Sequence, residues 1–108
     1  MIKKQNMPDC PVATTVQLIG SKWKLLILRN LSHRSWRFNE LKKDLEGISH
    51  KVLTDSLRSL EEDGLVDRVV FDENPPHVEY SLSTLGKEIF PILKTMEDFG
   101  RQYKERTV

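Results

Sequence analysis

One side of the segment from Ser49 to Val66 carries groups that could bind another molecule. Leu53, Leu57 and Leu60 recur at the four-then-three spacing of a buried helical stripe. The opposite side carries Lys51, Thr54, Asp55 and Arg58. Amino, guanidinium and hydroxyl groups can donate hydrogen bonds to base edges or to phosphate oxygens. The segment is therefore expected to be a helix with one buried face and one face that could contact nucleic acid.

The polar face also has a simpler explanation, as solvated surface. Lys51 and Asp55 are four residues apart, and Asp55 and Arg58 are three apart, so both pairs could form ion pairs on an exposed helix. Amphipathic helices are common, and the helix taken alone favours this explanation. The choice between the two therefore depends on the rest of the chain.

Charge is distributed unevenly along the chain. The 108 residues have a formal net charge of only +1, which by itself gives no strong sign of a nucleic-acid partner. Residues 1–60, however, contain eleven Lys or Arg against five Asp or Glu, whereas residues 61–108 contain six against eleven. The basic half holds most of the polar helix, which favours an anionic partner.

Composition and motifs argue against several functional classes. A single domain spanning residues 1–108 is the simplest expectation for this length. No apolar run approaches twenty residues and nothing resembles a signal peptide, so a cytoplasmic protein without membrane contact is expected. Cys10 is the single cysteine, and the three histidines lack metal-ligand spacing, so neither a metal nor another cofactor is expected. Phosphate-cradling and hydrolytic motifs are absent, which leaves an enzyme as the least favoured class.

Helix boundary signals divide the first third of the chain into two helices. Asp9 is expected to cap a helix over residues 10–19, which Gly20 would end. Ser21 is expected to cap an apolar helix over residues 22–31, and the apolar stripe of this second helix predicts that it lies in the core.

Two short helices joined by a tight turn are expected next. Residues 37–38 are predicted to be extended, and Asn39 to cap a helix over 40–46 that ends at Gly47. Ser49 would then cap the polar helix after only two intervening residues. Such a pair of helices is typical of a helix-turn-helix.

The remaining sequence predicts a hairpin and a long helix. Residues 65–71 are rich in β-branched side chains, the run "DENPP" is turn-prone, and residues 77–83 alternate strictly, which together predict a β-hairpin. Ser83 is expected to cap a final helix that bends at Pro91. An apolar row on this helix predicts a dimer interface, with the first helix packed beside it: Leu85, Ile89, Ile92, Met96, Phe99 and Tyr103.

A helix-turn-helix followed by a hairpin is a winged helix, and the sequence resembles the HxlR family of bacterial transcriptional regulators, relatives of the MarR type. Five blocks carry the resemblance in order: "CPV", "GSKWKLLIL", "RFNEL", "GISHKVLTDSLRSLEEDGLV" and "NPPHVEYSLSTLG". The resemblance implies a mainly α fold with a small β-hairpin, in which N- and C-terminal helices build a homodimer. It also implies binding to double-stranded DNA, and in some members an N-terminal cysteine serves as a redox or electrophile sensor.

The expected DNA contacts follow from the winged-helix arrangement. The recognition helix would present Ser49, His50, Lys51, Thr54 and Arg58 to a pseudo-palindromic operator. The phosphates of the DNA backbone would be neutralised by Arg37, Lys42 and Lys43. The wing would contribute Asn74 and His77. The wing also carries Asp72 and Glu73, so it is expected to hold phosphates weakly. Lys51 and Arg58 could each read a guanine or hold a phosphate, and Asp55 is expected to orient them.

The predicted function is a sequence-specific, homodimeric transcriptional regulator that acts as a repressor. The alternative is a winged-helix module that uses the same face for a protein partner, whose binding would depend less on salt. Cys10 is either a redox sensor at the start of the first helix or a small apolar residue packed beneath that helix.

Overall fold

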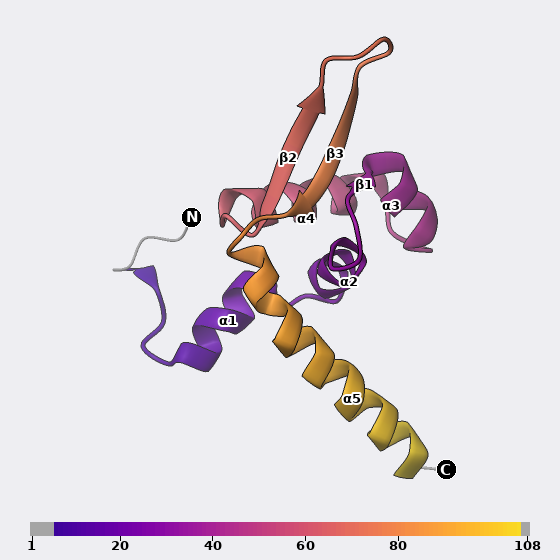
Figure 1. Ribbon diagram of the computed structural model, residues 1–108. Coiled ribbons are helices and arrows are strands. Elements are labelled where there is room, and N and C mark those ends of the chain that lie inside the picture. The colour runs from indigo at the N-terminus through magenta and orange to yellow at the C-terminus, as the bar shows by residue number, and fades with distance from the viewer. Residues whose placement is uncertain (1–5, 107–108) are drawn as a thin grey trace.

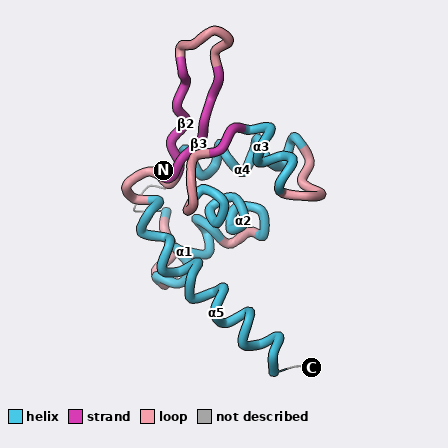
Figure 2. Tube along the Cα trace, turned by 45° about the vertical axis from the view of Figure 1, so that its right-hand side comes forward, coloured by secondary structure: helices cyan, strands magenta, loops and turns pink. Residues whose placement is uncertain are grey.

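The chain folds into a helical body from which a β-hairpin projects. The computed structural model describes residues 6–106 (Figure 1). The elements, in chain order, are α1 Pro11–Ile19, α2 Lys22–Leu31, β1 Trp36–Arg37, α3 Phe38–Asp44, α4 His50–Glu62, β2 Val66–Phe71, β3 His77–Leu82, the 3₁₀ helix η2 Gly86–Ile89 and α5 Phe90–Arg106. Figure 2 shows the hairpin and α5 extending from opposite sides of this body. Among the helices of the described region, none is long and apolar enough to cross a membrane.

The hydrophobic core lies where α2, α3, α4 and the base of the hairpin meet. Ile27 and Leu28 of α2, Leu41 of α3 and Leu53 of α4 are completely buried. Leu57 and Leu60 are buried beside them, which confirms the predicted apolar stripe of the polar helix. The core fixes which side of α4 faces inward, and it therefore also fixes which side faces outward.

The sheet has three antiparallel strands in the order β1-β3-β2. The predicted hairpin is confirmed, with Arg68 opposite Tyr80 and Val70 opposite Val78. On the other edge of β3, Trp36 pairs with Tyr80. The extended pair was predicted at 37–38, but the strand is Trp36–Arg37 and Phe38 already belongs to α3.

The caps at Ser21 and Ser49 were predicted correctly, and those of α1 and α3 were not. The side chains of Ser21 and Ser49 accept hydrogen bonds of 3.1 Å from the third amide beyond each of them. Cys10, rather than Asp9, occupies the N-cap of α1 and forms no side-chain cap bond. Arg37, rather than Asn39, occupies the N-cap of α3, because the carboxylate of Glu40 reaches back to accept a 2.8 Å hydrogen bond from the Arg37 amide.

The C-terminal segment begins differently from the prediction of one bent helix. A turn and η2 precede α5, which starts at Phe90. Pro91 therefore lies in the first turn of α5, where its missing amide costs no hydrogen bond, and its ring would crowd the carbonyl of Lys87 in a continuous helix. Ser83 does not cap α5 as predicted: its Oγ accepts a 2.9 Å hydrogen bond from the Gly86 amide, but Leu85 is the N-cap residue of η2, and α5 begins only at Phe90. Ile89 is buried in the core of the chain, so it does not share the exposed face of α5.

The start of this C-terminal segment is fastened to the base of the hairpin. Ser83 Oγ donates a 2.6 Å hydrogen bond to the Gly64 carbonyl, and the Ser83 amide donates one of 3.1 Å to the Leu65 carbonyl. A Cβ added to Gly86 would clash with the same Leu65 oxygen. Only glycine fits at position 86, because the two backbone segments are in direct contact.

Candidate nucleic-acid interface

The connection between α3 and α4 presents the first turn of α4 to solvent. Gly47 has a φ of +92°, a left-handed conformation that glycine adopts without strain. Ile48 follows and is buried, and its amide bonds to the Leu45 carbonyl at 3.1 Å. The turn is thus held by the core, and Ser49 and His50 are exposed at the helix N-terminus, where free amides and the helix dipole favour anions.

The outward face of α4 holds the predicted recognition residues together. His50, Lys51 and Arg58 are exposed and Thr54 is half-buried. Lys51 Nζ lies 2.6 Å from Asp55 Oδ2, although the Lys51 side chain is 84% exposed, so solvent screens this pair and it adds little stability. The hydrogen bond from Lys51 is the main cause that lowers the pKa of Asp55. Asp55 therefore stays ionised and can orient the Lys51 amino group.

His50 is held by two neighbours, which the sequence did not indicate. Its ring packs against Phe38 of α3, with centroids 4.9 Å apart. Its Nδ1 lies 3.5 Å from the Thr54 hydroxyl one turn later on α4. The side chain is thus fixed at the junction of α3 and α4.

The three predicted backbone contacts lie on and beside α3. Arg37 is the N-cap residue, and Lys42 and Lys43 are in the last turn, where cations stabilise the helix dipole. All three are exposed, and none forms an ion pair within the described part of the chain. Their charges are therefore available to neutralise phosphates.

A hollow of about 390 Å³ separates α4 from the hairpin. Its lining includes His50, Thr54, Arg58, Glu61, Arg68 and Tyr80. Arg68 was missed in the sequence, although the period-two pattern of a strand would have placed it on the same face as buried Val66. Side chains of the hairpin and of the polar face of α4 therefore line the same hollow.

Of the two residues predicted to contact DNA from the wing, one is exposed and the other is enclosed by its neighbours. Asn74 is exposed in the hairpin turn, but His77 is enclosed by acidic neighbours. His77 Nε2 lies 2.9 Å from Glu79 and its Nδ1 lies 3.5 Å from Glu73, while its ring stacks on Phe71. These contacts hold His77 within the wing, so its side chain is not free to reach outward.

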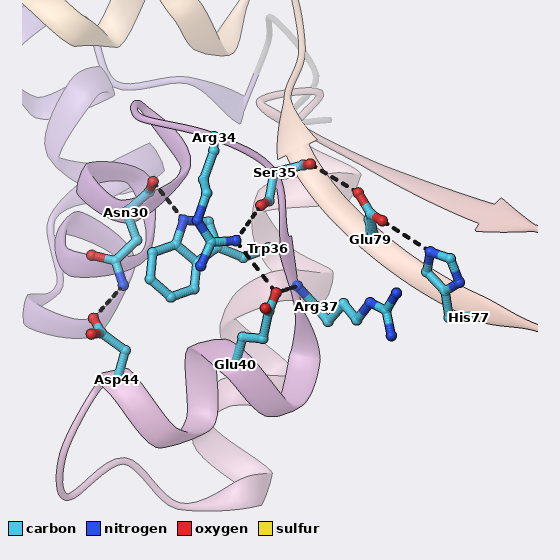
Figure 3. A network of polar contacts seen from close by, with 9 residues as sticks. All are labelled: Asn30, Arg34, Ser35, Trp36, Arg37, Glu40, Asp44, His77 and Glu79. Atoms are coloured by element: carbon cyan, nitrogen blue, oxygen red, sulfur yellow. Dashed lines mark hydrogen bonds and ion pairs between the residues drawn. The ribbon is translucent and has the colours of Figure 1, made fainter.

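A network of polar contacts links the hairpin to the helices (Figure 3). Ser35 Oγ donates a 2.9 Å hydrogen bond to Glu79, and this bond, followed by that from His77, lowers the pKa of the Glu79 carboxyl. Arg34 stacks over the ring of Trp36 at 3.7 Å and forms a 3.4 Å ion pair with Glu40. The Arg37 amide is the main cause that lowers the pKa of Glu40.

The same network reaches the core through α2. Trp36 Nε1 donates a 2.8 Å hydrogen bond to the Asn30 carbonyl, and Asn30 Nδ2 donates one of equal length to Asp44 (Figure 3). The positions of β1, α3 and the hairpin relative to α2 are thus fixed by hydrogen bonds as well as by apolar packing.

Other kinds of site have little support in this region. Within residues 6–106, no group of three or more His, Cys, Asp or Glu side chains is placed to hold a metal ion. Cys10 is exposed at the start of α1, which contradicts the alternative that it packs beneath this helix.

Two helices joined by a tight turn, followed by a hairpin and an exposed polar helix face, define a winged helix-turn-helix protein. Residues 18–108 match the HxlR-like helix-turn-helix family, and the chain belongs to that family. The resemblance seen in the sequence is therefore confirmed.

Relatives of this chain are transcriptional regulators. It is 44% identical to YdeP of Bacillus subtilis, an uncharacterized HTH-type transcriptional regulator, over 94% of this chain and 79% of YdeP. Among solved structures, the oxidized form of the redox regulator HypR is 40% identical, with a TM-score of 0.83 over 86% of this chain and 96% of HypR. The reduced transcriptional regulator YodB of B. subtilis is 29% identical, with a TM-score of 0.80 over 94% of this chain and all of YodB. The family is described as helix-turn-helix and these relatives are named as regulators, not as enzymes, in line with the sequence prediction.

Proposed function

We propose that this protein is a single-domain, sequence-specific transcriptional repressor that binds a pseudo-palindromic operator in double-stranded DNA as a homodimer. The observation that carries the proposal is the division of α4 between two environments. Leu53, Leu57 and Leu60 are buried, and the opposite face presents Lys51 and Arg58 to solvent. A helix of this size fits the major groove of B-DNA. With DNA as its partner, the protein would act in the cytoplasm.

The proposed dimer rests on apolar side chains that the single chain leaves exposed. On α5, Ile92, Met96, Phe99 and Tyr103 are between 39% and 67% exposed. On α1, Val12 and Val16 are also exposed. Exposed apolar rows of this length are typical of a subunit interface, and a second copy related by two-fold symmetry would cover them. Two recognition helices would then meet half-sites about one helical turn of DNA, or a small multiple, apart.

We also propose that Cys10 makes DNA binding sensitive to oxidants. Its thiol is exposed beside the N-terminus of α1, and HypR is named a redox regulator. The sequence holds one cysteine, so oxidation would join the Cys10 thiol either to the Cys10 thiol of a second protomer or to a small thiol as a mixed disulfide. Two thiols would lose two protons and two electrons to an oxidant such as diamide, and one S–S bond would form.

A footprint on the DNA that flanks the protein's own coding region tests the proposed function. Wild type is expected to protect two symmetric half-sites, and a Lys51→Ala/Arg58→Ala variant to protect neither. Affinity should also fall steeply as salt rises, because phosphate neutralisation releases counterions. Weak salt dependence together with no protected sequence would instead favour a protein partner for this face.

A further inference from the structure

Two arginines from different elements line the same hollow between α4 and the hairpin. Arg58 is on α4, and Arg68 is on β2 directly opposite Tyr80. Residues paired across antiparallel strands point to the same face of the sheet, so Arg68 shares the face of Tyr80. Both arginines line the hollow together with Thr54 and Glu61.

Among the residues that the structure describes, no carboxylate is paired with either arginine. Arg34, Lys51 and Arg101 each form ion pairs, but Arg58 and Arg68 form none within residues 6–106. Arg58 exerts only a minor electrostatic effect on Asp55, whose carboxylate is bound by Lys51. Glu61 borders the same hollow but is not within ion-pair distance of either guanidinium. Two cations that share a hollow repel each other unless an anion lies between them.

We propose that this hollow is a phosphate-binding cleft in which Arg58 and Arg68 hold one phosphate of the DNA backbone between them. The inference rests on the proposed function and makes it more specific. Guanidinium groups match the geometry of phosphate oxygens and can bind them with two hydrogen bonds each. The DNA strand would pass between α4 and the hairpin. Arg58 would then position the DNA, and Lys51, near the exposed helix N-terminus, would remain to read a base.

Changing Glu61 distinguishes a phosphate-binding role of the two arginines from a purely structural role, because the two roles predict opposite effects on DNA binding. If Arg58 and Arg68 held the hairpin against α4 through Glu61, removing the Glu61 charge would weaken both the fold and DNA binding. If the cleft holds a phosphate, the Glu61 carboxylate repels it, and Glu61→Gln should strengthen DNA binding. The sign of this one change therefore distinguishes the two roles.

The experiment compares DNA affinity at several salt concentrations for Arg58→Ala, Arg68→Ala, the double variant and Glu61→Gln. Arg106→Ala, which removes an exposed charge at the far end of α5, is the matched control. The probes are a duplex selected by wild type from a random library and a scrambled duplex of the same composition. Circular dichroism and thermal unfolding check that each variant is folded, and Arg68→Lys keeps a charge at that position should Arg68→Ala fail to fold.

Each arginine variant is expected to bind both duplexes about tenfold more weakly. Because both arginines of a protomer hold the same phosphate, the double variant should reduce the slope of log affinity against log salt by only about 1.8 in the dimer, which is about 0.9 for the one phosphate of each protomer. Its loss of affinity should be smaller than the product of the two single losses. Glu61→Gln should bind about twofold to fivefold more tightly, Arg68→Lys should bind better than Arg68→Ala, and Arg106→Ala should match wild type.

Three results would overturn the cleft while leaving the proposed function intact. The first is wild-type affinity in a folded Arg68→Ala variant. The second is weaker binding by Glu61→Gln. The third is an Arg58→Ala variant that loses discrimination at one base pair but binds the scrambled duplex as tightly as wild type. If wild type selects no sequence and binds neither duplex, the proposed function fails, and the cleft fails with it.

Discussion

Asn30 donates a 2.8 Å hydrogen bond to Asp44, which joins core helix α2 to the last residue of α3. Asn30 is only 4% exposed, and its side-chain oxygen accepts two hydrogen bonds from Arg29. A buried amide with partners on both sides is costly to disturb. Because α3 leads directly into the turn before α4, this contact helps to set the position of the proposed recognition helix.

Asn30→Ala is expected to lower the free energy of unfolding by about 1–3 kcal/mol, because it removes these bonds and leaves a small void. Urea unfolding of wild type and variant gives the difference. Asn39→Ala, at an exposed position of α3, is the control and should change stability little. Equal effects of the two substitutions would show that the Asn30–Asp44 contact does not stabilise the fold.

Lys51→Ala is expected to weaken binding to the selected duplex at least about tenfold. It should change stability by less than about 0.5 kcal/mol, because the residue is exposed. Asp55→Asn should instead raise affinity for a scrambled duplex, because it removes a negative charge near phosphate and releases Lys51. Fluorescence anisotropy measures both. Wild-type binding by Lys51→Ala would refute its assignment as a DNA contact.

Met96→Asp is expected to separate the proposed dimer, because it places a charge within the apolar row of α5. Wild type should sediment as a dimer at micromolar concentration, and the variant as a monomer. Gln102→Asp adds the same charge at an exposed position of α5 outside this row, so it should remain dimeric. A wild-type monomer, or a dimeric Met96→Asp protein, would argue against this interface.

The Glu79 carboxyl should contribute to the pH dependence of stability. Its hydrogen bonds from Ser35 and His77 lower its pKa in the folded state below the ordinary value of 4.5. The stabilisation is therefore present above about pH 4.5 and is lost as pH falls through the lowered pKa. Glu79→Gln should lose less stability than wild type over this acid range, whereas Glu105→Gln at an exposed site should follow wild type. Coincident curves for wild type and Glu79→Gln would contradict the assignment.

Oxidation should act on DNA binding through Cys10. Diamide is expected to reduce operator binding by wild type, to produce a covalent dimer in non-reducing gels, and to have its effect reversed by dithiothreitol. Cys10→Ser should bind the operator normally and should not respond. An equal response in the two proteins, or none in either, would leave no sensing role for this thiol.

Local signals in the sequence predicted local structure well. Ser21 and Ser49 cap helices through bonds to amides three residues away, and the buried stripe of α4 follows from its spacing alone. The hairpin was equally clear, because alternation and the turn residues point to the same segment.

The missed features depend on contacts between distant segments. Trp36 joins the sheet because Tyr80, far along the chain, offers a strand edge. The role of His77 could not be seen before Glu73 and Glu79 were placed around its ring. Arg68 was overlooked because its interest arises from sharing a hollow with Arg58, which no linear pattern records.

The close approach of Gly86 to the Leu65 carbonyl leaves these two backbone segments no room to shift against each other. The bonds from Ser83 to Gly64 and Leu65 fasten the same point, so the root of α5 and the base of the hairpin form one stiff corner. With 17 residues, α5 is a lever about 25 Å long on one side of that corner, and the hairpin is a shorter arm on the other. In a pair of protomers joined along α5, the angle at which the two long helices cross would therefore set the spacing between the two wings.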